Sequence, residues 1–292
     1  MNAIIIGSAA GGGFPQWNCR CPNCCLAWAG DPRAAPRNQA SLAVDCGDER
    51  ILLINATPDL RAQIAATPGL WPQAAPRHSP ISAVLLTGPD IDQTAGLLHL
   101  REGQSFELYA TAAIFAALDA NPIFDVLAPD IVRRHVLAIG KTLRFGDIEI
   151  DIFSVPGKMP IHRHPGAGED LSVGVEIRSA RTCVAYVPAA GAAPPRLLSR
   201  LAQVETVLFD GTLYSDDEMI RVGAGHKTGA RMGHMPIDGP AGSLAALSAL
   251  KSRRIFTHIN NTNPILIDGS PERRAVQSCG WEVAMDGLEI AL

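Results

Sequence analysis

Short runs of apolar and β-branched residues recur along the whole chain, and helical patterns fall between some of them. Some runs follow one another as hairpin neighbours do, whereas others alternate with helices. A mixed sheet structure with helices packed outside it satisfies both patterns. The expected strands are 3–6, 41–45, 51–55, 83–87, 148–154, 172–177, 183–187, 206–210, 254–259 and 282–285. The expected helices are 59–66, 92–100, 111–119, 196–203 and 242–251.

The chain shows no internal repeat and no low-complexity tail. Its stretch richest in Ala, Gly and Pro, residues 188–195, is too short for a domain linker. Hydrophobic residues make up 47% of the 292 residues, which is enough for a sizeable core. We therefore expect one domain over residues 1–292.

Charge and the lack of targeting signals limit the partners and the compartment. The formal net charge is −4, so neither nucleic acid nor an anionic membrane surface is an expected partner. No apolar run reaches the roughly 18–20 residues that a membrane span needs. The first residues lack the basic start and long apolar stretch of a secretory signal. Seven cysteines are an odd number, which in a chain without such a signal argues against a disulfide framework. We expect a cytoplasmic protein.

The strongest local signal is a cluster of three cysteines, Cys19, Cys21 and Cys24, in a turn that contains Pro22. Thiols at this spacing can converge on one ion, and zinc is the ion that soft thiolates suit best. The alternative is a chance cluster of free thiols. A zinc site needs a fourth ligand, which we expect to be a His or Asp from a remote loop, with Cys25 pointing elsewhere.

Three expected strands each carry a possible metal ligand at the carboxyl end. Asp90 and Asp92 follow strand 83–87, Asp210 ends strand 206–210, and His258 lies near the end of the strand at 254–259. The alternative for Asp92 is a simple helix N-cap. Between the last two strands lies the polar, glycine-punctuated segment 225–236, which contains His234 and is typical of a binding rim.

The use of lysine points to the same rim. The chain has only 4 Lys among its 25 basic residues, and two of them, Lys158 and Lys227, lie in motif-like loops. In such an Arg-rich chain, this placement favours a requirement for a compact ammonium group.

Several segments together resemble one family, that of the pyrroloquinoline quinone (PQQ) biosynthesis protein B. The resemblance spans nearly the whole chain, and its opening motif is very specific. The matching segments are 7–19 (GSAAGGGFPQWNC), Asp92 with 96–98 and 100–102, 209–212 (FDGT), 232–236 (MGHMP) and 259–264 (INNTNP).

This resemblance implies an α+β fold, the metallo-β-lactamase-like αββα sandwich, with two mixed sheets face to face and helices outside. The superfamily's His-x-His-x-Asp-His motif maps onto residues 88–93, where only Asp92 matches. The final His, which the family usually keeps, is Gln93 here, and a further His position corresponds to Lys158. Asp92, Asp210 and His258 remain, a set that suits one metal ion better than two.

The family resemblance also implies a role in PQQ biosynthesis from a precursor that carries a cross-linked Glu and Tyr. The leading hypothesis is an Fe(II)-dependent oxygenase, or hydroxylase, acting on this Glu–Tyr-derived precursor. Asp92, Asp210 and His258 would hold Fe(II), and His234 would be a further catalytic group that moves protons. The groups expected to bind substrate are Lys158, Lys227, Arg231 and Thr212.

The second hypothesis is a non-catalytic carrier that binds PQQ or its precursor for transport towards the periplasm, and the replacement at Gln93 motivates it. A hydrolase is the least favoured, because it would need a second metal ion without the usual His ligands. The expected partners are PQQ or its precursor and other PQQ-pathway proteins, and the sequence is compatible with a homodimer.

Overall fold

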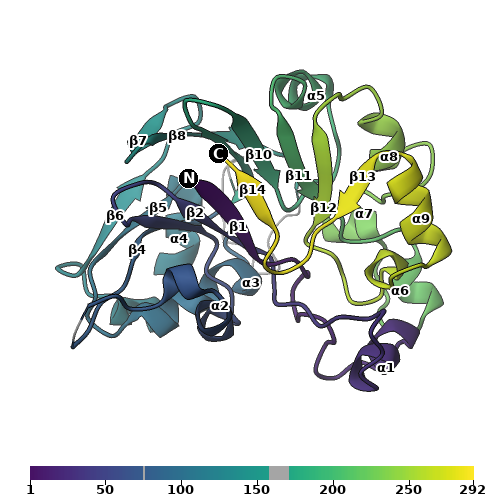
Figure 1. The fold of residues 1–292 in the computed structure, drawn as a ribbon, viewed down its shortest axis with the longest axis horizontal. Helices are drawn as coiled ribbons and strands as arrows, with labels where there is room; N and C mark the ends of the chain where they lie inside the picture. Colours follow the sequence, from purple (N-terminus) through teal and green to yellow (C-terminus); the bar gives the residue numbers. More distant parts are fainter. Residues whose placement is uncertain (75, 158–170) are drawn as a thin grey trace.

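The computed structural model describes residues 1–74, 76–157 and 171–292, and it consists of two seven-stranded sheets that face each other (Figure 1). The first sheet has the order β14 (Glu289–Ala291), β1 (Asn2–Gly7), β2 (Ser41–Asp45), β3 (Ile51–Ile54), β4 (Ile81–Leu85), β5 (Phe106–Ala110) and β6 (Val132–Val136). The second has the order β13 (Trp281–Val283), β12 (Arg253–Thr257), β11 (Thr206–Asp210), β10 (Cys183–Val187), β9 (Val173–Arg178), β8 (Ile148–Ser154) and β7 (Leu143–Phe145).

Both sheets are mixed, as the sequence predicts. In the first, β3 to β6 run parallel while β14, β1, β2 and β3 alternate in direction. In the second, β10 to β13 run parallel and β7 to β10 alternate. Parallel neighbouring strands have their carboxyl ends on the same side of each sheet. The candidate ligands lie on this side, at the carboxyl ends of the strands.

Helices cover the outer faces, which confirms the predicted sandwich. Helices α2 (Leu60–Ala66) and α4 (Ala112–Asp119) pack on the first sheet, with short 3-10 turns at 68–70, 95–100 and 122–126. On the second sheet lie α5 (Pro195–Leu201), α8 (Ser243–Ala246) and α9 (Pro271–Ser278). In the loops lie α1 (Pro22–Trp28), α3 (Ile91–Thr94), α6 (Glu218–Arg221), α7 (Gly229–Met232) and a 3-10 turn at 264–266.

The apolar side chains form three layers that follow from the period of the strands. Alternate residues of β8, Ile148, Ile150 and Ile152, enter the core between the sheets, whereas Phe153 faces outward towards α5. A separate cluster on the outside of the first sheet includes Ile114 of α4. Burial on both faces is why these strands are largely apolar.

Several expected bounds are confirmed and others are wrong. Strands 41–45, 148–154, 183–187 and 206–210 are present with those bounds, whereas β5, β6, β7 and β14 were not expected. The expected strand 254–259 ends at Thr257, because His258 turns to a left-handed φ of 54°. The expected helix 242–251 is only the short α8, and 92–100 is α3 followed by a 3-10 turn.

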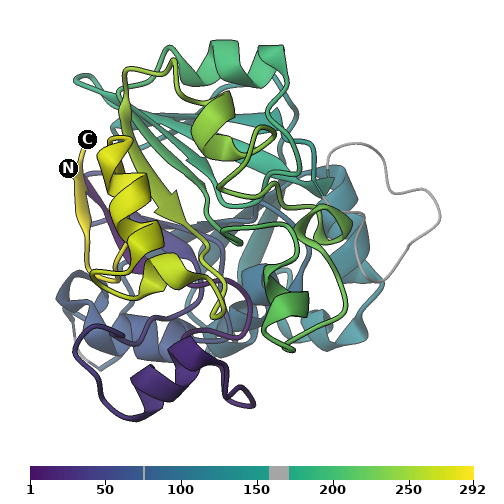
Figure 2. The ribbon, with the colours of Figure 1, turned by 90° about the vertical axis from the view of Figure 1, so that its right-hand side faces the viewer.

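Helix α1, in purple, lies next to the yellow segment that leads from β12 into α9 (Figure 2). Within the residues that the structure describes, no helix is long and apolar enough to cross a bilayer.

Candidate functional site

The strand ends bring the predicted metal-binding residues to one cavity. Asp210 ends β11, and its partner in the parallel strand β12 is Thr257, so His258 follows directly beside it. Asp92 comes from α3, at the carboxyl end of β4. His234 follows Gly233, which ends α7 in a left-handed conformation. Asp92, His234 and His258 line a cavity of about 290 Å³, and Asp210 lies fully buried directly behind them.

We call Asp92, Asp210, His234 and His258 the pocket centre. His234 Nδ1 lies 2.6 Å from Asp210 Oδ2, and His258 Nε2 lies 3.2 Å from Asp92 Oδ2. The two imidazole rings stack with their centroids 5.3 Å apart. Ligand atoms of Asp210, His234 and His258 lie within 4.8 Å of one another, and Asp92 contacts this group through His258. These mixed oxygen and nitrogen donors fit a divalent iron ion.

Burial and charge act in opposite directions on these groups. Burial alone would raise the pKa of Asp92, but the hydrogen bond and charge of His258 lower it below its usual value. Burial likewise acts to raise the pKa of Asp210, yet His234 and His258 lower it. For His258, burial acts to lower the pKa, and Asp92 and Asp210 raise it. The two carboxyl groups are therefore held ionised, as binding of a cation requires.

Thr212 lines the cavity, but its hydroxyl is engaged with the pocket centre itself. Thr212 Oγ1 lies 2.6 Å from Asp210 Oδ1 and 2.8 Å from His258 Nδ1. A partner on Nδ1 leaves the opposite ring atom, Nε2, to face Asp92 and the cavity. The structure thus gives Thr212 a positioning role, and its contact with substrate stays a prediction.

We expect Thr212→Val to weaken Fe(II) binding at the pocket centre about 10- to 100-fold, because losing an outer partner of a ligand has effects of this size. Anaerobic calorimetric titration with Fe(II) measures the change. The control is Thr206→Val, at the other end of β11. Equal affinities for the two variants would contradict a positioning role.

Gln93, which stands where the resemblance leads us to expect a His, is buried in local structure. Its Oε1 accepts a hydrogen bond from Asp90 N (3.3 Å), and its Nε2 donates to Thr87 Oγ1 (3.3 Å). With Asp90 it forms the capping box of α3. A Cβ on Gly88 would lie 2.2 Å from Gln93 Oε1, so the glycine makes room for this arrangement. The side chain of Gln93 therefore stabilises the N-terminus of helix α3.

The structure describes two of the three basic residues that we expect to bind substrate. Arg231 belongs to α7 and Lys227 to the loop before it. Both are exposed and precede the segment 232–234 in the chain, but neither is among the residues that line the cavity. Lys158 lies outside the described residues.

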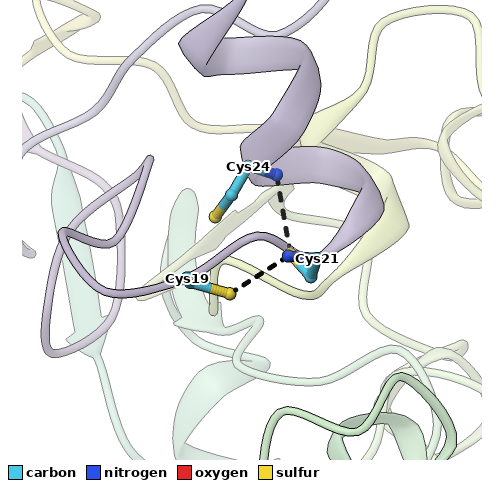
Figure 3. Close-up of side chains that lie close together, drawn as sticks. All are labelled: Cys19, Cys21 and Cys24. Carbon is cyan, nitrogen blue, oxygen red and sulfur yellow. Dashed lines mark hydrogen bonds between the residues drawn. The ribbon is translucent and has the colours of Figure 1, made fainter.

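Cys19, Cys21 and Cys24 form a second cluster, here called the thiol site (Figure 3). Their sulfur atoms lie within 4.8 Å of one another. Cys21 is the N-cap of α1, and its Sγ accepts from Cys24 N. Cys25 turns away, as predicted, and its Sγ lies 3.3 Å from Arg20 O. Burial raises the pKa of Cys21 to about 12, so this thiol stays protonated unless a cation replaces its proton. Three convergent soft donors fit zinc.

The remote residue that faces the three sulfurs is neither the expected His nor Asp. Within the described part of the chain, no His, Asp or Glu joins the three thiols. Instead, the carboxamide of Asn261 lies among them, with Nδ2 3.1 Å from Cys19 Sγ and 3.4 Å from Cys24 Sγ. Nothing local marks Asn261: 237 positions separate it from Cys24, and only the fold brings them together. The fourth ligand of the proposed zinc site stays a prediction.

Sequence reasoning also missed Glu218, a carboxyl group that is only 3% exposed. Its Oε1 accepts from Thr262 Oγ1 (2.5 Å), and its Oε2 accepts from Tyr214 N (2.7 Å). Burial raises the pKa of Glu218 to about 7. A single Glu in a polar segment gives no signal in the sequence.

Glu218 should make the protein less stable as the pH rises from about 4 to 8. In this interval the unfolded state releases the proton near the ordinary value of 4.5, while the folded state keeps it up to about 7. The folded state therefore binds more protons, and the free energy of unfolding falls by about 3 kcal/mol. Urea unfolding at several pH values measures this, and Glu218→Gln should flatten the profile. An unchanged slope in the variant would exclude Glu218 as the cause.

Comparison with known proteins identifies the family of this chain. Residues 50–259 match the family model described as a beta-lactamase superfamily domain. The chain is 51% identical to coenzyme PQQ synthesis protein B of Methylobacterium nodulans and 49% identical to that of Xanthomonas campestris, with 100% of each chain covered. The chain belongs to the coenzyme PQQ synthesis protein B family.

Solved structures agree with the family and the fold. The crystal structure of Zn²⁺-bound PqqB from Methylobacterium extorquens superposes with a TM-score of 0.96 at 49% identity, and both chains are fully covered. A diphosphatase of the PhnP family superposes with a TM-score of 0.71 at 22% identity, over 99% of this chain and 97% of that one. At that identity, the diphosphatase supports the sandwich fold alone.

Proposed function

We propose that this protein acts in PQQ biosynthesis as an Fe(II)-dependent oxygenase of the Glu–Tyr-derived precursor. The observation that carries the proposal is the pocket centre, where ionised carboxylates and imidazoles converge on one cavity. Its relatives at about half identity are named for PQQ synthesis.

Asp92, Asp210 and His258 would hold the metal ion. Once bound, Fe(II) would supply the activation of O₂ next to the substrate. Asp210 is also held by Ala190 N (2.8 Å) and Thr212 N (3.0 Å), which fix its carboxylate before any ion arrives. Such fixed donors lose little freedom on binding, which favours affinity.

His234 would move protons during the reaction. Its Nδ1 lies 2.6 Å from Asp210 Oδ2, so Nε2 is the ring atom left for a substrate group in the cavity. The contact with Asp210 orients the ring towards the cavity. The exposed Lys227 and Arg231 would attract the carboxylates of the precursor, together with Lys158.

The thiol site would hold a structural zinc ion. The reason is the set of three convergent sulfurs at the start of α1, from the buried Cys21 and Cys24 and the partly buried Cys19. A zinc-bound crystal structure of a relative at 49% identity supports zinc as the metal.

The test is a single reaction followed by mass spectrometry. Protein loaded anaerobically with Fe(II) is mixed with the precursor and then with O₂, and the product should be heavier by oxygen. Asp210→Asn keeps the size of the side chain but removes one ligand charge, so it should give no such product. An unchanged precursor mass with the wild type would refute the oxygenase.

The second candidate is a carrier for PQQ or its precursor, for transport towards the periplasm. The observation that favours it is Gln93, whose side chain caps α3 where the resemblance leads us to expect a His. Metal-free protein would then bind PQQ much more tightly than an unrelated tricarboxylate. Equal affinity for the two compounds would rule the carrier out.

A further inference from the structure

One short segment joins the pocket centre to the thiol site. It consists of residues 258–263, directly after β12, and we call it the linking loop. His258 and Asn260 line the cavity, whereas the carboxamide of Asn261 lies among the three sulfurs. Because three positions separate His258 from Asn261, a shift of the loop at one site displaces a ligand at the other.

The linking loop is tied to the thiol site by both the side chain and the backbone of Asn261. Its Nδ2 lies 3.1 Å from Cys19 Sγ, 3.4 Å from Cys24 Sγ and 3.7 Å from Cys21 Sγ. Asn23 of α1 donates from Nδ2 to the carbonyl oxygens of Asn261 (3.1 Å) and Asn263 (2.9 Å). All of these groups are buried or nearly so, and water competes little for these contacts.

The linking loop also forms hydrogen bonds to the two residues that follow Asp210 of the pocket centre. Asn260 N donates to Thr212 O (3.0 Å), and Asn263 Nδ2 donates to Gly211 O (2.8 Å). His258 adopts a φ of 54°, a left-handed conformation that costs energy for a residue other than glycine. The surrounding contacts must therefore maintain the orientation of His258, and Asn261 supplies the contacts on one side.

We propose that Asn261 is a positioning residue through which the state of the thiol site sets the metal affinity of the pocket centre. The inference rests on the metal-binding roles proposed above. A zinc ion would hold the three sulfurs as thiolates, and their charge would strengthen the N–H···S contacts of Asn261. The loop would then hold His258 in place, so that occupancy of one site favours occupancy of the other.

The experiment compares wild type, Asn261→Ala and the control Asn121→Ala, each loaded with one equivalent of zinc. Asn121 is exposed at the end of α4, where its Nδ2 bonds only locally to Ala117 O. Titration with Co²⁺ measures the affinity of the pocket centre, because binding to thiolates instead would add a sulfur-to-cobalt charge-transfer band. Hydrogen exchange of the amides of residues 257–260 reports on the loop without any metal in the pocket.

In Asn261→Ala we expect the Kd for Co²⁺ to rise about tenfold and the amides of 257–260 to exchange faster. Asn121→Ala should match the wild type. A second control, Leu118→Ala in the core outside the first sheet, lowers stability without touching the loop. Co²⁺ affinity and exchange within twofold of wild type in Asn261→Ala would overturn the proposal, and so would an equal loss in Leu118→Ala. If the wild type binds no Co²⁺ at the pocket centre, the proposed oxygenase is refuted. The hydrogen-exchange rates of residues 257–260 then still decide whether Asn261 holds the linking loop in place.

Discussion

Replacing His258 with asparagine should remove the metal from the pocket centre. We expect Fe(II) affinity to fall by more than about 100-fold, the upper range for losing an outer partner, because His258 is a direct ligand in the proposed site. The product heavier by oxygen should disappear with it. Asparagine is chosen because it tolerates the left-handed φ of 54° at this position, so the backbone is preserved. Anaerobic Fe(II) titration and the mass assay provide the two measurements.

The control is His99→Ala, at an exposed histidine in the 3-10 turn of residues 95–100. It removes an imidazole without touching the cavity and should leave Fe(II) affinity unchanged. If His258→Asn still bound one Fe(II) per chain with wild-type affinity, the assignment of this ligand would be wrong.

Replacing Cys24 with alanine should remove zinc from the thiol site and destabilise the fold. Cys24 is fully buried, and the proposed ion cross-links the loop before α1 to α1 itself. We expect loss of about one zinc per chain and a free energy of unfolding lower by at least about 3 kcal/mol, since binding energy at a structural site is folding energy. Elemental analysis and urea unfolding measure the two effects.

Cys25→Ala is the matched control for this variant, because the neighbouring thiol points away from the cluster. It should keep the zinc and lose little stability. Equal zinc contents in Cys24→Ala and wild type would show that the three thiols do not hold the ion.

The fold was largely predictable because its strands are short, apolar and evenly spread. Of the unexpected strands, β6, β7 and β14 lie at the edges of the sheets, and β5 lies next to the edge strand β6. β6 carries Arg133, Arg134 and His135, and only its first residue is buried. β7 and β14 have three residues each, too few to show a period. For such segments, pairing with a neighbouring strand decides the structure.

By itself, the sequence determined the parts of both sites that neighbouring residues or strand ends define. Cys19, Cys21 and Cys24 converge within one turn, and Asp210 and His258 meet because parallel strands carry them to the same edge. The tertiary structure decided the rest: the proximity of Asn261 to the sulfurs, the burial of Glu218 and the contacts of Thr212 with His258. These depend on partners 44 to 242 positions away, and single polar residues carry no pattern that reveals such distant partners.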